Sequence, residues 1–375
     1  RMNNAIYRSG NLQNIISIDA LGTQTAEVIF GPGSLIYGSD AIGGVMDFHS
    51  LNAGFSKDKK MLVSGSALAR YSTANKENTF HADINLGFKR WSLLSSVTYS
   101  KFDDLKMGKH GGQSSYLRPE YVERINGIDS IVKNSNSRIQ RFSGYEQINF
   151  LQKIRYKPTE HFDIQYSFTY AGTGNAPRYD RLIQYRSGKL RFAEWNYGPM
   201  LWRMHNLQML HSKKNILYDD LRVTVAYQNY DESRIDRTRA SNNRNIQAEK
   251  VNAISVNIDA NKKMGKGDLF YGAEYVYNKV GSVGSKTNIT NNAVTPAVSR
   301  YPDGSTWNTS GIYGSYKINI IPVLTLTGGL RYSYNTLNAS FDTTFIKFPY
   351  QKAALKDGAF TGNLGLVYRP TTTWQ

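Results

Sequence analysis

The chain has 375 residues, enough for two or three soluble domains or one large β structure, and it contains no cysteine. Disulfide frameworks and thiolate metal sites are therefore excluded, and no apolar run reaches the roughly 18 residues of a membrane-spanning helix. The net charge of +17 is spread over proposed loops and strand ends. This favours anionic lipid, an anionic solute or ordinary solubility over nucleic-acid binding, which needs a concentrated basic surface.

Aromatic residues are abundant, with 26 Tyr, 16 Phe and 5 Trp against 10 Pro. Tyr and Trp gather where one end of the ring is apolar and the other is hydrated, as in the aromatic girdles of membrane β-barrels. Soluble β proteins can also be rich in tyrosine, so this composition favours a barrel without deciding it.

The most distinctive local pattern lies in the first fifty residues, between Glu27 and Val45. It predicts an apolar strand over 28–30, a Gly-Pro break, one short helical turn, and a glycine pair that leads into a second strand. Pro32 suits the first position of a helix, where a missing N–H costs nothing. The glycines that follow permit tight bends and close backbone approach.

From residue 50 onward, apolar and polar residues alternate with period two, which is typical of β-strands with two different faces. Phe80, Ile84 and Phe88, for example, share one face, while His81 and Asn85 share the other. The predicted strands have about the length that a tilted strand needs to cross a bilayer. They lie near 61–71, 78–90, 91–102, 146–157, 161–171, 200–212, 219–231, 249–262, 267–279, 308–320, 323–337 and 359–369.

The connections between these strands alternate in length. Short turns are expected at 89–90, 157–160, 213–218, 264–267 and 321–322, and long polar loops at 103–145, 172–199, 232–248, 280–307 and 338–358. A soluble sandwich has no reason to keep all of its long loops at one end. Membrane barrels do so, with short periplasmic turns and long extracellular loops. The asymmetry therefore predicts an antiparallel transmembrane β-barrel.

The segment between Glu27 and Val45 resembles the signature at the end of the plug domain in TonB-dependent outer-membrane receptors. The residues that carry this resemblance are Gly31, Pro32, Ser34, Tyr37, Gly38, Gly43 and Gly44. One departure is Phe30, where many members have Arg or Lys before the Gly-Pro pair, so an identical plug-to-wall salt bridge is not expected. The style of the loops is most similar to that of receptors from Bacteroidetes.

The resemblance implies an all-β membrane fold with two parts. Residues 1–50 would be the C-terminal part of an α+β plug domain, and residues 51–375 the N-terminal part of the barrel, with about 12 strands. Plugged transporters close with about 22 strands. We therefore expect the remaining strands, and the N-terminal box that TonB pulls, to lie outside this chain.

The function that the resemblance implies is energised import across the bacterial outer membrane. The expected cargo is a scarce nutrient, an iron-siderophore or heme first, with cobalamin or a glycan as alternatives. The expected partners are TonB, outer-membrane lipid and lipopolysaccharide, and the small nutrient ligand, with a surface lipoprotein left open. No nucleic acid, cofactor or metal is expected. No phosphate-binding loop and no His-x-x-x-His, paired-Cys or Gly-x-Ser-x-Gly motif is present. Spacing alone leaves open an outer-membrane hydrolase with a Ser-His dyad, against which the plug signature argues. A second alternative is a passive porin, which has no plug and needs no energy source.

Three groups of residues are candidates for contact with the solute or the plug. Tyr7, Arg8 and Asn11 belong to the proposed plug apex. Arg178, Tyr179, Arg181, Trp195 and Tyr197 belong to a long loop, where arginine beside aromatic rings can pair with carboxylates and stack on a planar ligand; packing between loops is the alternative. His110 in another loop could ligate heme iron. The candidate lumen groups toward the plug are Asp83, Asn85, Asp163, Gln165, Arg222, Gln228, Glu274 and Arg331.

Overall fold

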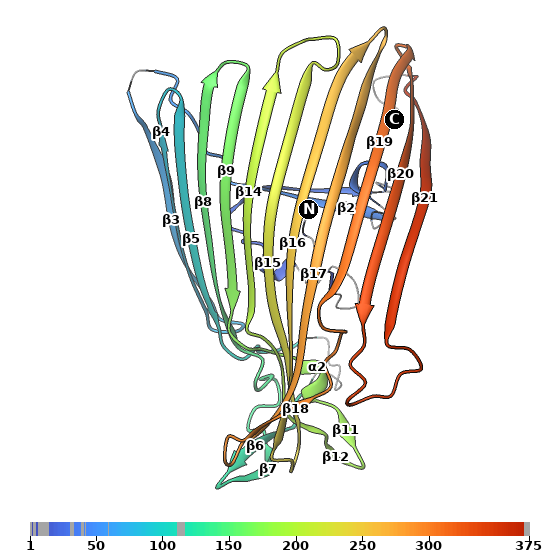
Figure 1. Cartoon of the computed structure of the whole chain (residues 1–375). Coiled ribbons are helices and arrows are strands. Elements are labelled where there is room, and N and C mark those ends of the chain that lie inside the picture. Colours follow the sequence, from blue (N-terminus) through green and yellow to red (C-terminus); the bar gives the residue numbers. More distant parts are fainter. Residues whose placement is uncertain are drawn as a thin grey trace.

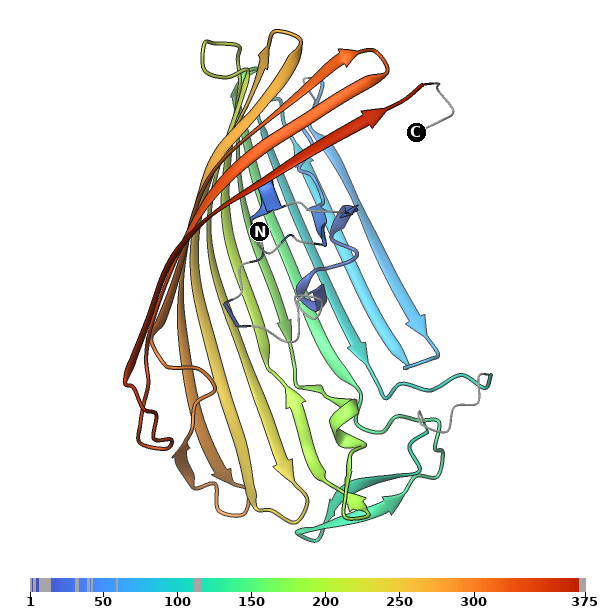
Figure 2. The same cartoon turned by 90° about the vertical axis from the view of Figure 1, so that its right-hand side faces the viewer.

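A computed structural model describes residues 2, 5–6, 15–30, 34–38, 41, 43–58, 60–110 and 117–370. Within these ranges, twelve strands follow one another in a single antiparallel sheet, each paired with its neighbours in the chain. The sheet curves into an open trough (Figures 1 and 2). Its strands are β3 (Leu62–Ser72), β4 (Glu77–Gly87), β5 (Trp91–Phe102), β8 (Tyr145–Thr159), β9 (Phe162–Thr173), β14 (Met200–Ser212), β15 (Asp220–Thr238), β16 (Asn243–Met264), β17 (Gly267–Asn288), β19 (Ser305–Ile321), β20 (Leu324–Ser340) and β21 (Lys352–Tyr368).

The smaller elements occupy two places. β1 (Thr23–Phe30) and β2 (Gly44–Ser50) pair with each other, with the helical turn α1 (Ser34–Tyr37) between them, and they lie on the concave side of the sheet (Figure 2). The others belong to the long connections, at the lower end in Figure 1. They are β6 (Glu120–Ile125), β7 (Ile128–Lys133), β10 (Ala176–Pro177), α2 (Tyr179–Leu182), β11 (Tyr185–Arg186), β12 (Lys189–Leu190), β13 (Phe192–Tyr197) and β18 (Val294–Ala297).

Burial in the sheet is inverted relative to a soluble protein. Along β4, Phe80 and Ile84 are 56% and 46% exposed, whereas the residues that directly follow them, His81 and Asn85, are 6% and 5% exposed. On β20, Leu330 is 68% exposed while its neighbour Arg331 is 1% exposed. An apolar outer face around a polar interior is what a lipid-embedded barrel requires. No helix among the described residues is long and apolar enough to span a membrane.

A direct test of the lipid-facing surface is to place a charge on it. Replacing Ile258, which is 43% exposed on the outer face of β16, by arginine should destabilise the barrel in lipid by about 2–4 kcal/mol. Ile258 is paired with Val223 of β15, and the next residue of that strand, Thr224, faces the lumen. Thr224→Arg is therefore the matched control, and it should change stability little because the lumen is polar. Urea unfolding in lipid vesicles measures both values, and equal losses would contradict this assignment of the faces.

The twelve predicted strands are all present, but the lengths of four were wrong: β21 begins at Lys352, seven residues before its predicted start, and the other three are β15, β16 and β17. β15, β16 and β17 continue well past the predicted ends, so the expected loop at 232–248 shrinks to a short turn and the one at 280–307 begins after Asn288. The outer face becomes polar beyond Tyr227, where Asn229 accepts a hydrogen bond from Arg203 and donates one to Asn252. The strands therefore leave the apolar layer at this level and keep pairing above it.

We call the described residues among 15–54, which include β1, α1 and β2, the inner segment. Side chains of the sheet donate hydrogen bonds to its backbone carbonyls: Gln147 to Ile16 (2.6 Å), Asn149 to Ser17 (3.4 Å), Lys153 to Ser50 (3.2 Å), Arg155 to Ala53 (3.3 Å), Asn85 to Gly54 (3.2 Å) and Arg331 to Leu35 (3.3 Å). Thr98 adds a bond to the Asp19 carboxylate at 2.6 Å. Polar contacts thus hold this segment against the wall.

The predicted strand–turn–strand pattern of the signature is confirmed by β1, α1 and β2. Gly38 has a φ of +91°, a conformation that favours glycine. A Cβ on Gly44 would lie 2.6 Å from the carbonyl oxygen of Ile29, so only glycine lets β2 approach β1 this closely. Gly43, Tyr37 and Ser34 belong to the same short stretch, while Gly31 and Pro32 lie outside the described residues.

Candidate solute-binding vestibule

The five candidate residues of the 172–199 connection come together at the end of the sheet that carries the long connections. Arg178 precedes α2, and Tyr179 and Arg181 lie on it. Trp195 and Tyr197 lie on β13, which pairs with the outer part of β15 and so stands directly above the barrel wall. The extension of β15 beyond the apolar layer is therefore what positions this group.

Arg178 is fixed from several sides. Its guanidinium carbon lies 5.1 Å from the ring centre of Trp195 and 5.6 Å from that of Tyr197. Its Nη1 donates to the Tyr197 hydroxyl at 2.9 Å, and its Nε donates to Asp180 at 2.9 Å. A guanidinium held against two rings is pre-organised for a planar or carboxylate-bearing solute.

The two rings that contact Arg178, those of Trp195 and Tyr197, also have a packing role. Trp195 and Tyr197, each 9% exposed, form a buried cluster with Leu182, Phe192 and Met200. Ile16 of the inner segment packs against the same cluster. The packing role is thus present in the structure, and contact of these residues with a solute stays a prediction.

Tyr179 and Arg181 extend the group toward the other loops. The ring centre of Tyr179 lies 5.4 Å from the guanidinium carbon of Arg118, which also donates to the carbonyl of Arg141. Burial raises the pKa of Tyr179, and burial lowers the pKa of Arg118. Arg181 lies 3.9 Å from Asp180 and keeps 38% of its side chain exposed. Of Tyr179 and Arg181, Arg181 is the more accessible to a solute that arrives from outside.

We call Arg178, Tyr179, Arg181, Trp195 and Tyr197, with the side chains that contact them, the vestibule. Sequence reasoning missed three arginines that belong to it. Arg118 sits under Tyr179, Arg234 lies 5.4 Å from the ring of Tyr197, and Arg300 lies 4.8 Å from the ring of Tyr301 and 3.8 Å from Glu232. One sequence signal could have pointed to Arg234: it lies three residues before Arg237, so two arginines stand close together in the segment that was predicted as a loop. The concentration of cations suits an anionic solute.

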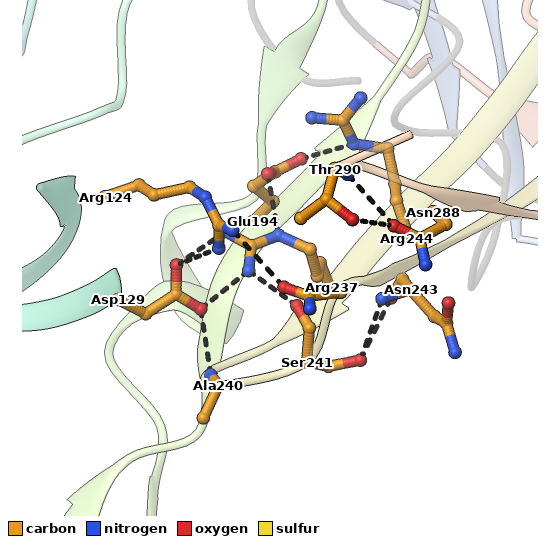
Figure 3. A network of polar contacts seen from close by, with 11 residues as sticks. Arg124, Asp129, Glu194, Arg237, Ala240, Ser241, Asn243, Arg244, Asn288 and Thr290 are labelled. Atoms are coloured by element: carbon orange, nitrogen blue, oxygen red, sulfur yellow. Dashed lines mark hydrogen bonds and ion pairs between the residues drawn. The ribbon is translucent and has the colours of Figure 1, made fainter. Parts of the chain in front are cut away.

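A network of charges joins the long connections beside this group (Figure 3). Asp129 of β7 pairs with Arg237 of β15, which also pairs with Glu194 of β13, and Glu194 pairs in turn with Arg244 of β16. Burial alone would raise the pKa of Asp129 and of Glu194, but hydrogen bonds from their arginine partners lower both. Their stabilising effect is therefore complete above the ordinary carboxyl pKa and is lost only in acid.

The other predicted lumen groups have separate roles. Asn85 and Arg331 contact the inner segment directly, as predicted, and Glu274 pairs with Arg331. Asp163 holds Arg155, which reaches the same segment. Asp83 accepts from Ser66, and Gln228 accepts from Trp202 at 3.2 Å. Nearer the short turns, a polar cavity of about 230 Å³ is lined by Asn52, Arg155, Asp163, Gln165, Gln208, Leu210 and Arg222.

The remaining candidates cannot be placed in this site. Tyr7, Arg8 and Asn11 lie outside the described residues. Just before them, Ile6 packs against Trp202, Tyr230, Val251 and Val280 on the inner face of the sheet. His110 is exposed, and across the described ranges no three His, Cys, Asp or Glu side chains come together as a metal site.

Comparisons with known proteins agree with this architecture. Residues 156–375 match the family model described as TonB dependent receptor-like, beta-barrel. Among solved structures, the chain is similar to the copper transporter OprC, with a TM-score of 0.73 and 15% identity over 95% of this chain and 50% of that one. No curated protein matches the chain.

Two further solved structures show the same likeness. The ferric yersiniabactin uptake receptor FyuA from Yersinia pestis gives a TM-score of 0.64 at 15% identity, over 93% of this chain and 50% of that one. The Serratia marcescens hemophore receptor HasR, in complex with its hemophore HasA and heme, gives 0.60 at 12% identity, over 94% and 50%. The chain spans about half the length of these proteins, and at such identities the likeness concerns the fold.

Proposed function

This chain belongs to the TonB-dependent receptor family of outer-membrane transport receptors, and we propose that it serves energised import of a scarce nutrient. An iron-siderophore or heme is the first candidate cargo, and cobalamin or a glycan comes second. In this proposal residues 1–50 are the C-terminal part of the plug and residues 51–375 the N-terminal part of the barrel. TonB would act through a box at the plug's N-terminus.

One observation carries the proposal: a segment inside the trough is held by polar contacts to the wall. A segment bound by hydrogen bonds to wall side chains can be rearranged without dismantling the apolar outer face. A passive porin, the second candidate, would leave the lumen open, whereas Arg331, Lys153 and Thr98 each donate a hydrogen bond to the inner segment.

The proposed route runs from the vestibule to the polar cavity. Arg178, Tyr179, Arg181, Trp195 and Tyr197, together with Tyr7, Arg8 and Asn11, are the proposed solute contacts. The cavity is lined by Asn52 of the inner segment and by wall residues near the short turns, such as Asp163 and Leu210. Displacement of the segment would connect the two.

Growth tests of the full-length gene decide between import and passive diffusion. Strains with and without the gene are compared on iron-siderophore, heme, cobalamin and glycan as the limiting source, each with and without TonB. We expect growth to be lost on one source and the loss to be reproduced without TonB. Uptake that persists without TonB and rises linearly with concentration would instead support the porin.

Within the vestibule, Arg178→Leu should weaken uptake of the nutrient so identified. Loss of a charge-assisted hydrogen bond of about 1.5–3 kcal/mol predicts a half-saturation concentration roughly 10–100-fold higher. Arg186 of β11 is exposed, and Arg186→Leu is the matched control. Radiolabelled uptake measures the change, and an unaltered half-saturation concentration for Arg178→Leu would remove this residue from the solute site.

A further inference from the structure

The carboxylate of Asp129 is the centre of the network in Figure 3. Its side chain is 0% exposed. It accepts hydrogen bonds from Nη1 and Nη2 of Arg237 at 2.6 and 3.0 Å, from Nη1 of Arg124 at 3.3 Å and from the amide of Ala240 at 2.8 Å. The donors come from β6 and from the outer end of the β15–β16 hairpin. A single buried side chain thus ties the β6–β7 hairpin to the barrel wall.

Arg237 connects this centre to the candidate site. Its side chain is 3% exposed, and it donates through Nε to Glu194 at 2.9 Å and through Nη1 to the Ser241 carbonyl at 2.8 Å. Together with its two bonds to Asp129, these use four of the five N–H donors of the guanidinium. Glu194 lies on β13, next to Trp195, and also accepts from Arg244 at 2.6 Å.

Weaker contacts complete the assembly. Arg124 donates to Asn242 at 3.2 Å, the Tyr185 hydroxyl donates to Glu120 at 2.9 Å, and Arg239 donates to the Leu190 carbonyl at 3.2 Å. The β11–β12 hairpin is thereby joined to β6 and to the wall. Every one of these bonds links segments that are far apart in the chain, so the contacts do not depend on local loop structure.

The connection between β20 and β21 is built differently. The Phe341 amide donates to the Gln351 carbonyl at 2.8 Å, and the Thr344 amide donates to Asp342 at 2.8 Å. The rings of Phe341, Phe348 and Tyr350 pack against one another in tilted or edge-to-face arrangements, with ring centres 4.9–6.3 Å apart. These contacts close that connection on itself.

We propose that residues 117–142, 176–199 and 234–245 form one preassembled rim unit, with Arg237 as the positioning residue that holds β13, and with it Arg178, Trp195 and Tyr197, in place before any solute arrives. The role in positioning rests on the proposed function, whereas preassembly is independent of it. Because both carboxylates keep lowered pKa values, the unit stays assembled throughout the neutral range.

Preassembly is tested on solute-free, full-length receptor in lipid. This chain contains no cysteine, so spin labels can be placed at introduced cysteine pairs. One such pair is introduced by Ile128→Cys and Lys279→Cys. Ile128 is 70% exposed at the tip of the β6–β7 hairpin, and Lys279 lies on the outer face of β17. We expect a narrow distance distribution for this pair, a clearly broadened one in Arg237→Gln, and no change in Asp342→Asn, the matched control in the β20–β21 connection.

Arg237→Gln leaves Asp129 and Glu194 without their shared partner and could prevent folding. Arg244→Gln is the second variant, because its side chain is 37% exposed and touches only one end of the network. It should fold and give a smaller broadening. A broad distribution in the unmodified receptor, or a narrow one that neither variant changes, would overturn the proposal whatever the cargo is.

Positioning is tested by uptake of the heme or ferric siderophore that supports growth. Arg244→Gln and, where it folds, Arg237→Gln should raise the half-saturation concentration at least fivefold and leave the maximal rate unchanged, because the solute contacts are displaced and not removed. A lower maximal rate with an unchanged half-saturation concentration would overturn the positioning role. Absence of any uptake by the unmodified receptor would count against the proposed function instead.

Discussion

Replacing Arg331 by methionine is expected to destabilise the receptor by about 3–5 kcal/mol, because the change leaves a buried carboxylate without its partner. Arg331 is 1% exposed and pairs with Glu274, whose side chain is 3% exposed. It also donates to Ser333 at 2.8 Å and to the Leu35 carbonyl at 3.3 Å. Urea unfolding in lipid vesicles measures the loss.

Two further variants separate the ion pair from the rest of the site. Adding Glu274→Leu to Arg331→Met should restore most of the lost stability, because removal of both charges ends the uncompensated burial. Arg222 is an exposed arginine on the lumen face, and Arg222→Met should cost less than about 1 kcal/mol. If the double variant were as unstable as the single one, the ion pair would not be the source of the effect.

Replacing Gly329 by valine is expected to displace α1 from the wall. A Cβ at this position would overlap the side chain of Leu35 and lie 3.0 Å from the carbonyl oxygen of Gly314. Overpacking of this kind costs about 1–3 kcal/mol, and here a shift of α1 relieves it. The labelling rate of a cysteine introduced by Ile36→Cys, next to the displaced side chain, should rise.

Gly365 provides the matched control for this substitution. It faces the lumen on β21, opposite Thr327, and a Cβ there meets nothing closer than 4.0 Å. Gly365→Val should leave the labelling of the cysteine introduced by Ile36→Cys unchanged. Equal labelling rates in the two valine variants would show that Leu35 is not seated on Gly329.

The barrel could be predicted from the sequence because its two faces meet different solvents. Where Phe80 and Ile84 face lipid and His81 and Asn85 face the lumen, the period of two is visible in the sequence and survives in the structure. The resemblance to TonB-dependent receptors and the outer-membrane location are confirmed by the match of residues 156–375 to the family model. The closer assignment to Bacteroidetes-type receptors stays a prediction, as do the solute and the division at residue 50.

The outer parts of β15–β17 could not be predicted, because the alternation of apolar outer and polar inner residues ends there, and Tyr230, Val251 and Val280 pack on the inner face. Beyond Tyr227, partners such as Asn229 and Asn252 erase the alternation although the backbones remain paired. The rim unit could not be predicted from the sequence for a different reason. Asp129 and Arg237 are 108 positions apart, and no local pattern links a charge in one loop to a charge at the end of a distant strand.

The hydrogen bonds between the wall and the inner segment have an evolutionary consequence. Gln147, Asn149, Lys153, Arg155 and Arg331 all donate to main-chain oxygens. A main-chain oxygen is supplied by any amino acid, so residues 17 and 50 can change in descendants without loosening these bonds, whereas Ile16, Leu35 and Ala53 are also constrained by packing. The donors are side chains, and their replacement would remove the bonds. We therefore expect substitutions to accumulate faster at the acceptor positions of the inner segment than at the donor positions of the wall.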